Sequence, residues 1–253
     1  MFKNLKYDIP LDLDSPERTI FHQKIIKEKL FLKKLYDEWY KVFTDVKPQL
    51  PDGKMVELGS GGGFLKEIEP TVICSDVLEL PTNDLTFSAL EMPFKDEEIS
   101  AVFMIDTFHH IPDSKQFLNE INRVLKKDGM LVMIEPANSL WGRFIYQNFH
   151  HEPFDVNGDW KIPASGPLSG ANGALPWIVF KRDIHKFETS LPELKLIEFR
   201  HHTPLRYLVS GGVSFKQLAP DFMYPFFKLI DKFLAAVSSQ FSMFVTIKIR
   251  KVE

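Results

Sequence analysis

The chain has 253 residues, of which 44% are hydrophobic and 26% are charged, and its formal net charge is -3. This composition excludes a disordered chain and gives no overall attraction to nucleic acid, so we expect no nucleic-acid partner. The single cysteine, Cys74, excludes an internal disulfide, and no apolar run reaches the roughly 18 residues of a transmembrane helix. The first residues lack the apolar core of a signal peptide, so we expect a cytoplasmic protein.

Residues 1–50 are expected to form a helical arm. Ser15 can cap the start of a helix, and Pro16 fits its first position. Apolar side chains then recur at roughly helical spacing, at Phe21, Ile25, Leu32, Leu35, Trp39 and Phe43. This spacing predicts one or two helices, and the lysines between the apolar positions are expected to form their solvated face.

Residues 51–136 alternate between strands and helices. Short apolar runs occur at KMVELG, TVICSD, LTFSA, AVFMID and GMLVMIEP. Between the last two lies DSKQFLNEINRVLKKDG, a helix that Asp113 or Ser114 can cap and that Gly129 is expected to end. The alternation predicts an α/β fold with a mostly parallel sheet and helices on both of its faces.

Two long segments follow, 137–193 and 201–241, and we expect both to be insertions in a single domain that spans residues 1–253. A sixth strand, ELKLIEFR, lies between them, and SMFVTIKIRK closes the chain as a seventh. The second segment contains an amphipathic helix with an apolar stripe of Phe226, Leu229, Ile230, Phe233, Leu234 and Val237. We expect this stripe to pack against the sheet, with peripheral membrane contact as the alternative.

The most informative stretch is VELGSGGGFL, in which a strand is followed by Gly59, Gly61 and Gly63. Glycine permits positive φ and lets a ligand approach the backbone, and the helix that starts near Phe64 would offer unpaired N–H groups. A dinucleotide fingerprint needs glycine at its sixth position, where Phe64 stands, and no G-K-[ST] of a P-loop follows. From these residues alone, a tight turn that binds nothing remains open.

The pattern E-x-G-x-G-x-G resembles the first motif of class I S-adenosylmethionine-dependent methyltransferases. Asp76 then ends the second strand, and SALEMPFKDEEISAVFMIDTFHHIPD and VLKKDGMLVMIEP resemble later motifs of the same methyltransferase-11-like set. HHEPFD and SGANGALPW resemble a bacterial subgroup of the family. The resemblance implies a Rossmann-like, seven-stranded sheet whose last strand is antiparallel.

It also implies S-adenosylmethionine as the cofactor, bound mainly by residues 51–136. Its methionine part would lie against Glu57, Gly59, Ser60, Gly61 and Gly63, its ribose against Asp76 and Val77, its adenine against Ser88, Ala89 and Leu90, and its sulfonium end against Ile105 and Asp106. Ser88 stands where the family often has an aspartate, so adenine selectivity is expected to depend more on Ala89 and Leu90.

The resemblance places 137–193 and 201–241 on the acceptor side. There NFHHEPFDVNGDW contains His151 and Glu152, which, with His110, are the candidates for a base or an acceptor contact. The alternative is that they only form structural hydrogen bonds beneath a long loop. No metal is expected, because His150 and His151 are adjacent in sequence and no cysteine lies near them.

The sequence therefore predicts methyl transfer from S-adenosylmethionine to a small-molecule or lipid-like acceptor. Nucleic-acid methylation is not expected, because the fourth strand ends in MIDTFHH rather than in an N-P-P-Y motif. A nicotinamide-dependent oxidoreductase is one alternative, against which Phe64 in the glycine motif counts. A non-catalytic cofactor-binding or scaffold protein is the other, because sequence alone fixes no catalytic residue.

Overall fold

The computed structural model describes residues 7, 11–163 and 166–253. Its strands form one seven-stranded sheet in the order β3-β2-β1-β4-β5-β7-β6. Strands β1 to β5 pair in parallel, whereas β7 runs antiparallel to both β5 and β6. The strands are β1 Lys54–Leu58, β2 Ile73–Asp76, β3 Leu85–Thr86, β4 Ile99–Ile105, β5 Leu125–Pro136, β6 Leu194–His202 and β7 Phe244–Lys251. The expected α/β, Rossmann-like sheet with an antiparallel last strand is confirmed.

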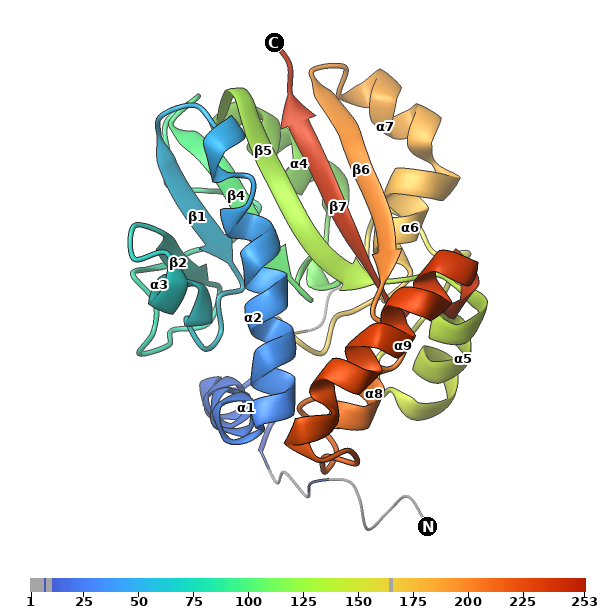
Figure 1. The fold of residues 1–253 in the computed structure, drawn as a ribbon. Helices are drawn as coiled ribbons and strands as arrows, with labels where there is room; N and C mark the ends of the chain where they lie inside the picture. The colour runs from blue at the N-terminus through green and yellow to red at the C-terminus, as the bar shows by residue number, and fades with distance from the viewer. Residues whose placement is uncertain (1–6, 8–10, 164–165) are drawn as a thin grey trace.

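Helices cover both faces of this sheet (Figure 1). The helices are α1 Pro16–Glu28, α2 Leu30–Thr44, α3 Phe64–Ile68, α4 Ser114–Val124, α5 Leu140–Phe149, α6 Leu175–Trp177, α7 Ile184–Ser190, α8 Arg206–Ser210 and α9 Tyr224–Val237. Short helical turns are η2 Lys47–Gln49, η3 Phe108–His110, η4 Ile178–Arg182, η5 Asp221–Met223 and η6 Ser239–Phe241. Helix α2 crosses the near face of the sheet, and α4 lies behind it (Figure 1).

Aromatic packing fixes α2 on the sheet. The Phe43 ring stacks on Phe103 of β4 at a centroid distance of 4.8 Å, and Trp39 lies 4.7 Å from Phe244 of β7. Every residue of β4 is buried, as expected for a central parallel strand covered on both faces. The carboxyl ends of β1, β2 and β4 are therefore held in fixed positions relative to one another.

The helical arm is divided at Lys29. Ser15 caps α1 by accepting a hydrogen bond from the Arg18 N–H, as the sequence predicts. Lys29 separates α1 from α2 and is buried, with its ammonium group donating to the carbonyl oxygens of Ser210, Gly212 and Phe215. Burial lowers the pKa of Lys29 to about 8. These bonds tie the junction of α1 and α2 to the segment that follows α8.

The helix before β5 is shorter than the sequence predicts. Helix α4 starts at Ser114 with Asp113 as its cap, but it ends at Val124 and not at Gly129. Residues 125–128 instead extend β5, with an irregularity in its pairing with β4. A Cβ at Gly129 would lie 2.8 Å from the Lys126 carbonyl oxygen, so this glycine permits a close backbone approach within the strand.

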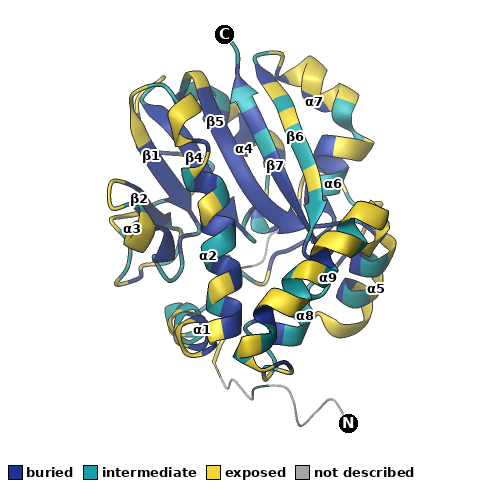
Figure 2. Cartoon of the chain, viewed as in Figure 1, coloured by how far each residue is buried: buried dark blue, intermediate teal, exposed yellow. Residues whose placement is uncertain are grey.

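Helix α9 contradicts the expectation that its apolar stripe packs against the sheet. Phe226, Leu229, Phe233 and Val237 expose 55%, 67%, 67% and 60% of their surface, and α9 buries only Tyr224 and Asp231 (Figure 2). The reason is an ion pair on the opposite face. The Asp231 carboxylate accepts hydrogen bonds from the Leu205 N–H and, at 2.7 Å, from the Arg206 guanidinium.

The Arg206 guanidinium also pairs with Glu38 of α2 at 2.7 Å. Helix α9 is thus attached through buried charges and through the packing of Tyr224 on Phe31, and four of the six residues of its apolar stripe face outward. Among the described residues, none of the helices combines the length and the apolar character needed to cross a membrane.

Candidate functional site

A cavity of about 500 Å³ lies at the carboxyl ends of β1, β2, β4 and β5, beneath α1 and the segment that follows α5. This volume is within the usual range of ligand pockets, roughly 300–1,000 Å³. The expected acceptor residues His110, His151 and Glu152 line it. So do eleven of the twelve expected cofactor residues, namely Glu57, Gly59, Ser60, Gly61, Asp76, Val77, Ser88, Ala89, Leu90, Ile105 and Asp106. The twelfth, Gly63, does not line the cavity and instead forms the N-terminal cap of α3.

The glycine loop adopts left-handed backbone conformations at its three alternate glycines, Gly59, Gly61 and Gly63, with φ values of 66°, 49° and 68°. L-residues with a side chain adopt this region only at a cost. A Cβ at Gly59 would lie 2.4 Å from the Thr107 Oγ1, whereas one at Gly61 would have Thr19 at 3.6 Å as its nearest neighbour. The loop therefore presents an open backbone surface to the cavity at Gly61.

The two glycines give a matched pair of variants. Gly59→Ala is expected to lower the free energy of unfolding by about 2 kcal/mol or more, because backbone strain adds to the overlap with Thr107. Gly61→Ala carries the same strain without the overlap, and we expect a loss of about 1 kcal/mol. Urea unfolding of both variants measures the difference. Equal losses would show that contact with Thr107 does not require glycine at position 59.

Glu57 is a buried carboxyl group that lacks a full set of partners. It is 2% exposed, and neither its Oε2 nor the nearby Ser60 Oγ has a hydrogen-bond partner among the described residues. Burial, with a smaller contribution from the charge of Asp76, raises the pKa of Glu57 well above its usual value. Buried polar atoms are normally paired, so these two groups fit a ligand that brings both a hydrogen-bond donor and a hydrogen-bond acceptor.

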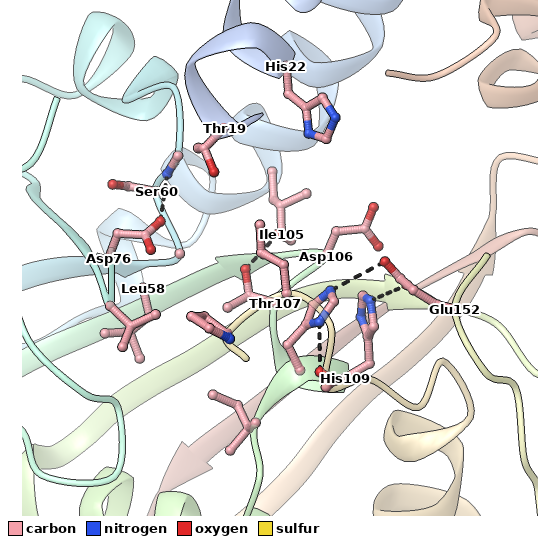
Figure 3. Close-up of a pocket in the computed structure, with 18 of the residues that line it drawn as sticks. Thr19, His22, Leu58, Ser60, Asp76, Ile105, Asp106, Thr107, His109 and Glu152 are labelled. Carbon is pink, nitrogen blue, oxygen red and sulfur yellow. Dashed lines mark hydrogen bonds and ion pairs between the residues drawn. The ribbon is translucent and has the colours of Figure 1, made fainter. Parts of the chain in front are cut away.

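Asp76 lies at the opposite end of the cavity from His109 and Glu152 (Figure 3). Its Oδ1 accepts a hydrogen bond from the Leu78 N–H at 3.0 Å and its Oδ2 accepts one from the Gly61 N–H at 3.3 Å. Each carboxylate oxygen has a further lone pair, which fits a diol. Burial raises the pKa of Asp76, and its backbone hydrogen bonds oppose this shift.

Ser88 and Asp106 border the cavity between these ends. The Ser88 hydroxyl is exposed and accepts a hydrogen bond from the Leu90 N–H at 3.2 Å. Asp106 directly follows β4 and has a positive φ of 53°. Burial raises the pKa of Asp106 to about 7, against the opposing charge of His109. Asp106 is therefore a carboxyl group that changes charge near neutral pH inside the cavity.

His109 is held between two carboxylates. Its Nδ1 lies 2.7 Å from the Glu135 Oε2. Its Nε2 lies 3.1 Å from the Glu152 Oε2, and this second contact can be followed in Figure 3. Burial disfavours the imidazolium, but the hydrogen bonds and charges of Glu135 and Glu152 outweigh burial and raise the pKa of His109 well above its usual value. For Glu152, burial is outweighed by His109, which keeps the pKa of this carboxyl group well below its usual range. The group is thus a charged carboxylate–imidazolium–carboxylate array.

Glu135 also fixes the backbone after β4. Its Oε1 accepts hydrogen bonds from the Thr107 N–H at 2.9 Å and the Phe108 N–H at 2.7 Å. The side chain is fully buried. One carboxylate thus positions both the η3 turn and the His109 imidazole.

His110 is the neutral neighbour of His109. Its Nδ1 lies 3.0 Å from the Gly170 carbonyl oxygen, and a carbonyl can only accept, so we assign the proton to Nδ1. The Nε2 then keeps its lone pair, 3.6 Å from the Glu152 Oε1. Burial, together with the charge of His109, lowers the pKa of His110 to about 4. Two hydrogen-bond acceptors, the His110 Nε2 and the Glu152 carboxylate, therefore lie side by side in the cavity.

The adjacent histidines of the HHEPFD stretch both approach Glu152. The His150 Nδ1 lies 3.6 Å from its Oε2, and the His151 Nε2 lies 3.7 Å from its Oε1. The ligand atoms of the three residues lie within 4.8 Å of one another. Adjacency in sequence therefore does not keep the two histidines from approaching one carboxylate.

Two contributors to the candidate site are missing from the sequence interpretation. Glu135, which contacts His109 but does not itself line the cavity, is one. A signal for it exists, because β1, β2, β4 and β5 each have an acid at or next to their last residue. These acids are Glu57, Asp76, Asp106 and Glu135. The other is the helical arm, which contributes Thr19, His22 and Gln23 of α1 and Tyr36 and Tyr40 of α2. No local motif marks these arm residues.

Comparison with known proteins agrees with this geometry. Residues 56–133 match the family described as "Methyltransferase domain". The geranyl diphosphate C-methyltransferase from Streptomyces coelicolor A3(2), solved with Mg²⁺, geranyl diphosphate and S-adenosyl-L-homocysteine, has a TM-score of 0.51 at 13% identity, over 98% of this chain and 90% of that one. A putative methyltransferase in complex with the Haloferax volcanii Trm112 activator has a TM-score of 0.50 at 13% identity, over 92% of this chain and 97% of that one.

At these identities the two solved structures establish the fold, and the family match covers the strands and loops that form the cofactor end of the cavity. The match begins at Val56, before the glycine loop, and ends at Met133, within β5. Residues 56–133 therefore belong to the methyltransferase-domain family, within a chain that has the fold of the two solved methyltransferases.

Proposed function

We propose that the chain transfers the methyl group of S-adenosylmethionine to a small-molecule or lipid-like acceptor that presents a hydroxyl or amino group to Glu152 and His110. The observation that carries this proposal is the division of one cavity into two ends. The glycine loop and Asp76 lie at one end. The atoms of Glu152 and His110 that can accept hydrogen bonds lie at the other.

The residues of the first end fit the cofactor. The unpartnered oxygens of Glu57 and Ser60 suit its amino and carboxylate groups, the open face of Gly61 suits close approach, and Asp76 suits its ribose. The bound cofactor supplies a methyl group that is already activated on a sulfonium. The chain then has mainly to orient the acceptor and exclude water.

The second end favours an acceptor that donates hydrogen bonds. The His110 Nε2 and the Glu152 Oε1 are both acceptors, and their 3.6 Å separation lets one hydroxyl or amino group reach both. None of the described residues that line the cavity is a lysine or an arginine. A diphosphate, such as the ligand bound to the Streptomyces enzyme, would find few cations here, which favours a neutral or cationic acceptor group.

Asp76→Ala tests the cofactor end. We expect it to weaken S-adenosylhomocysteine binding by roughly 1–3 kcal/mol, because a charged hydrogen-bonding partner is lost. Asp76→Asn keeps one oxygen acceptor and should lose less. His151→Ala, at the other end, is the matched control and should leave binding unchanged. Calorimetry measures all three, and unchanged binding by Asp76→Ala would remove the ribose assignment.

The acceptor end is tested by turnover. The chain is incubated with S-adenosylmethionine and a panel of amines, small alcohols and lipid-like alcohols, and formation of S-adenosylhomocysteine is measured. His110→Ala and Glu152→Gln are expected to lower turnover of the accepted compound without weakening cofactor binding. If both variants keep full turnover, Glu152 and His110 only hold the loop in place.

A further inference from the structure

Helices α5 and α9 present a shared apolar surface to solvent. On α9 and the turn before it, Phe222, Phe226, Leu229 and Phe233 expose between 55% and 81% of their surface. On α5, Leu140 and Phe144 expose 70% and 50%. An exposed apolar area of this extent on one side of a protein indicates a binding surface.

The two helices are joined by η6. Both pack against this turn, and the Leu140 N–H at the start of α5 donates a hydrogen bond to the Gln240 Oε1. Phe241 of η6 is itself 40% exposed. The apolar side chains of α5 and α9 therefore belong to one continuous surface, which we call the α5–α9 surface; the two helices lie close together in Figure 1.

Two exposed lysines lie on α9 and on the segment before it, and the acid of the η5 turn, Asp221, accepts hydrogen bonds from the Phe31 N–H and the Gln217 side chain. Lys232 lies on α9 between Leu229 and Phe233, and Lys216 lies on the segment that leads into α9; both are exposed. Neither has a carboxylate partner among the described residues. The acid of α9, Asp231, is buried and pairs with Arg206. Apolar side chains flanked by unpaired lysines are typical of a helix that lies in the interface of an anionic bilayer.

The α5–α9 surface also leads directly to the mouth of the cavity. Helix α5 ends at Phe149, and the next three residues, His150 to Glu152, line the cavity. On the other side, Val213 and Ser214 line the cavity, shortly before Lys216. A second copy of the chain is the alternative occupant of this surface, and the test below distinguishes it from a membrane.

We propose that the α5–α9 surface docks the protein on an anionic lipid bilayer, with α9 lying in the plane of the membrane interface. This orientation places the mouth of the cavity next to the bilayer, from which an amphipathic acceptor can enter without crossing water. Membrane docking is independent of the proposed acceptor chemistry, because the surface lies outside the cavity.

The test is vesicle flotation of the full chain. One set of vesicles contains phosphatidylcholine alone, and the other contains phosphatidylcholine mixed with phosphatidylglycerol. We expect flotation with the anionic vesicles, weakened by salt, and about tenfold or more weaker binding by the double variant Phe226→Ser and Phe233→Ser. Lys216→Glu with Lys232→Glu should remove the preference for anionic lipid.

The matched control is Ile68→Ser with Ile197→Ser, which changes two side chains of 43% and 47% exposure outside the surface and should bind like the original chain. Equal flotation of the Phe226 and Phe233 variant would overturn the proposal, as would absence of binding to both kinds of vesicle. A dimer that this variant converts to a monomer would assign the surface to self-association instead. Calorimetry with S-adenosylhomocysteine on the same preparations tests the cofactor site separately.

Discussion

Glu135→Ala is expected to lower the free energy of unfolding by about 3–5 kcal/mol, the usual cost of removing one partner from a buried ion pair. The variant leaves the buried His109 imidazolium with Glu152 alone. It also removes the acceptor of the Thr107 and Phe108 N–H groups, which become unpaired. Urea unfolding monitored by circular dichroism measures the loss.

The matched control for this variant is Glu198→Ala. Glu198 also pairs with two cations, Arg200 and Lys248, but it lies on the partly exposed strand β6, so we expect a loss below about 1 kcal/mol. A double variant that also replaces His109 should cost less than the sum of the two single changes, because no unpaired charge then remains. If Glu135→Ala costs no more than Glu198→Ala, the array does not stabilise the fold.

The same carboxylate–imidazolium–carboxylate array predicts how the stability of the fold changes with pH. The folded pKa of His109 is raised, so its contribution to stability is complete below its unfolded pKa of about 6.5 and is lost as the pH rises through the folded value. The folded pKa of Glu152 is lowered, so its contribution is present above about 4.5 and is lost as the pH falls through the folded value. The stability difference between the original chain and Glu135→Ala should therefore shrink as the solution becomes alkaline.

Most of the sheet, and the convergence of the glycine loop and Asp76 on one end of the cavity, could be predicted from the sequence, because their signals are local. Strands β1, β2 and β4 are short apolar runs that end at the glycine turn or at an acid, and Gly59 and Gly61 adopt the positive φ values that their spacing indicates. A local pattern predicts the boundary of a helix or strand less well than its presence, as Gly129 shows. There a close approach of the Lys126 carbonyl oxygen within the same strand, and not helix termination, requires the glycine.

The acceptor end depends on contacts between distant parts of the chain, and these were not predictable from local patterns. Glu135 and Glu152 meet His109 only because the ends of β4 and β5 and the segment after α5 converge. Helix α9 shows the same limit. Its amphipathic pattern predicts an apolar face but not the direction of that face, which the distant Arg206 sets by pairing with Asp231.

The second large effect concerns the pH dependence of cofactor affinity. Below about pH 7 the Asp106 carboxyl group is protonated in the ligand-free chain, and above it the group is a carboxylate that attracts a cation. S-adenosylmethionine carries a sulfonium charge and S-adenosylhomocysteine does not. If Asp106 borders the sulfonium, affinity for S-adenosylmethionine should rise as the pH increases toward 7, by at most about tenfold per pH unit for one linked proton, and then level off.

Glu57 illustrates a pH effect that both ligands would share, in contrast to the effect of Asp106, which is specific to S-adenosylmethionine. Its pKa is also raised, but we propose that it contacts the amino group, which both ligands carry, so it should affect the two affinities alike. Asp106→Asn should therefore remove only the part of the pH dependence that is specific to S-adenosylmethionine. Asparagine tolerates the positive φ at this position, so we expect the backbone to be retained.

Calorimetric titration of both ligands across this pH range measures the difference, with Asp96→Asn as a control because Asp96 is an exposed acid outside the cavity. Parallel pH profiles for the two ligands would place Asp106 away from the sulfonium. In that case the Asp106 carboxyl group would face the methyl acceptor. A carboxylate that forms near neutral pH suits removal of a proton from a hydroxyl or ammonium group there.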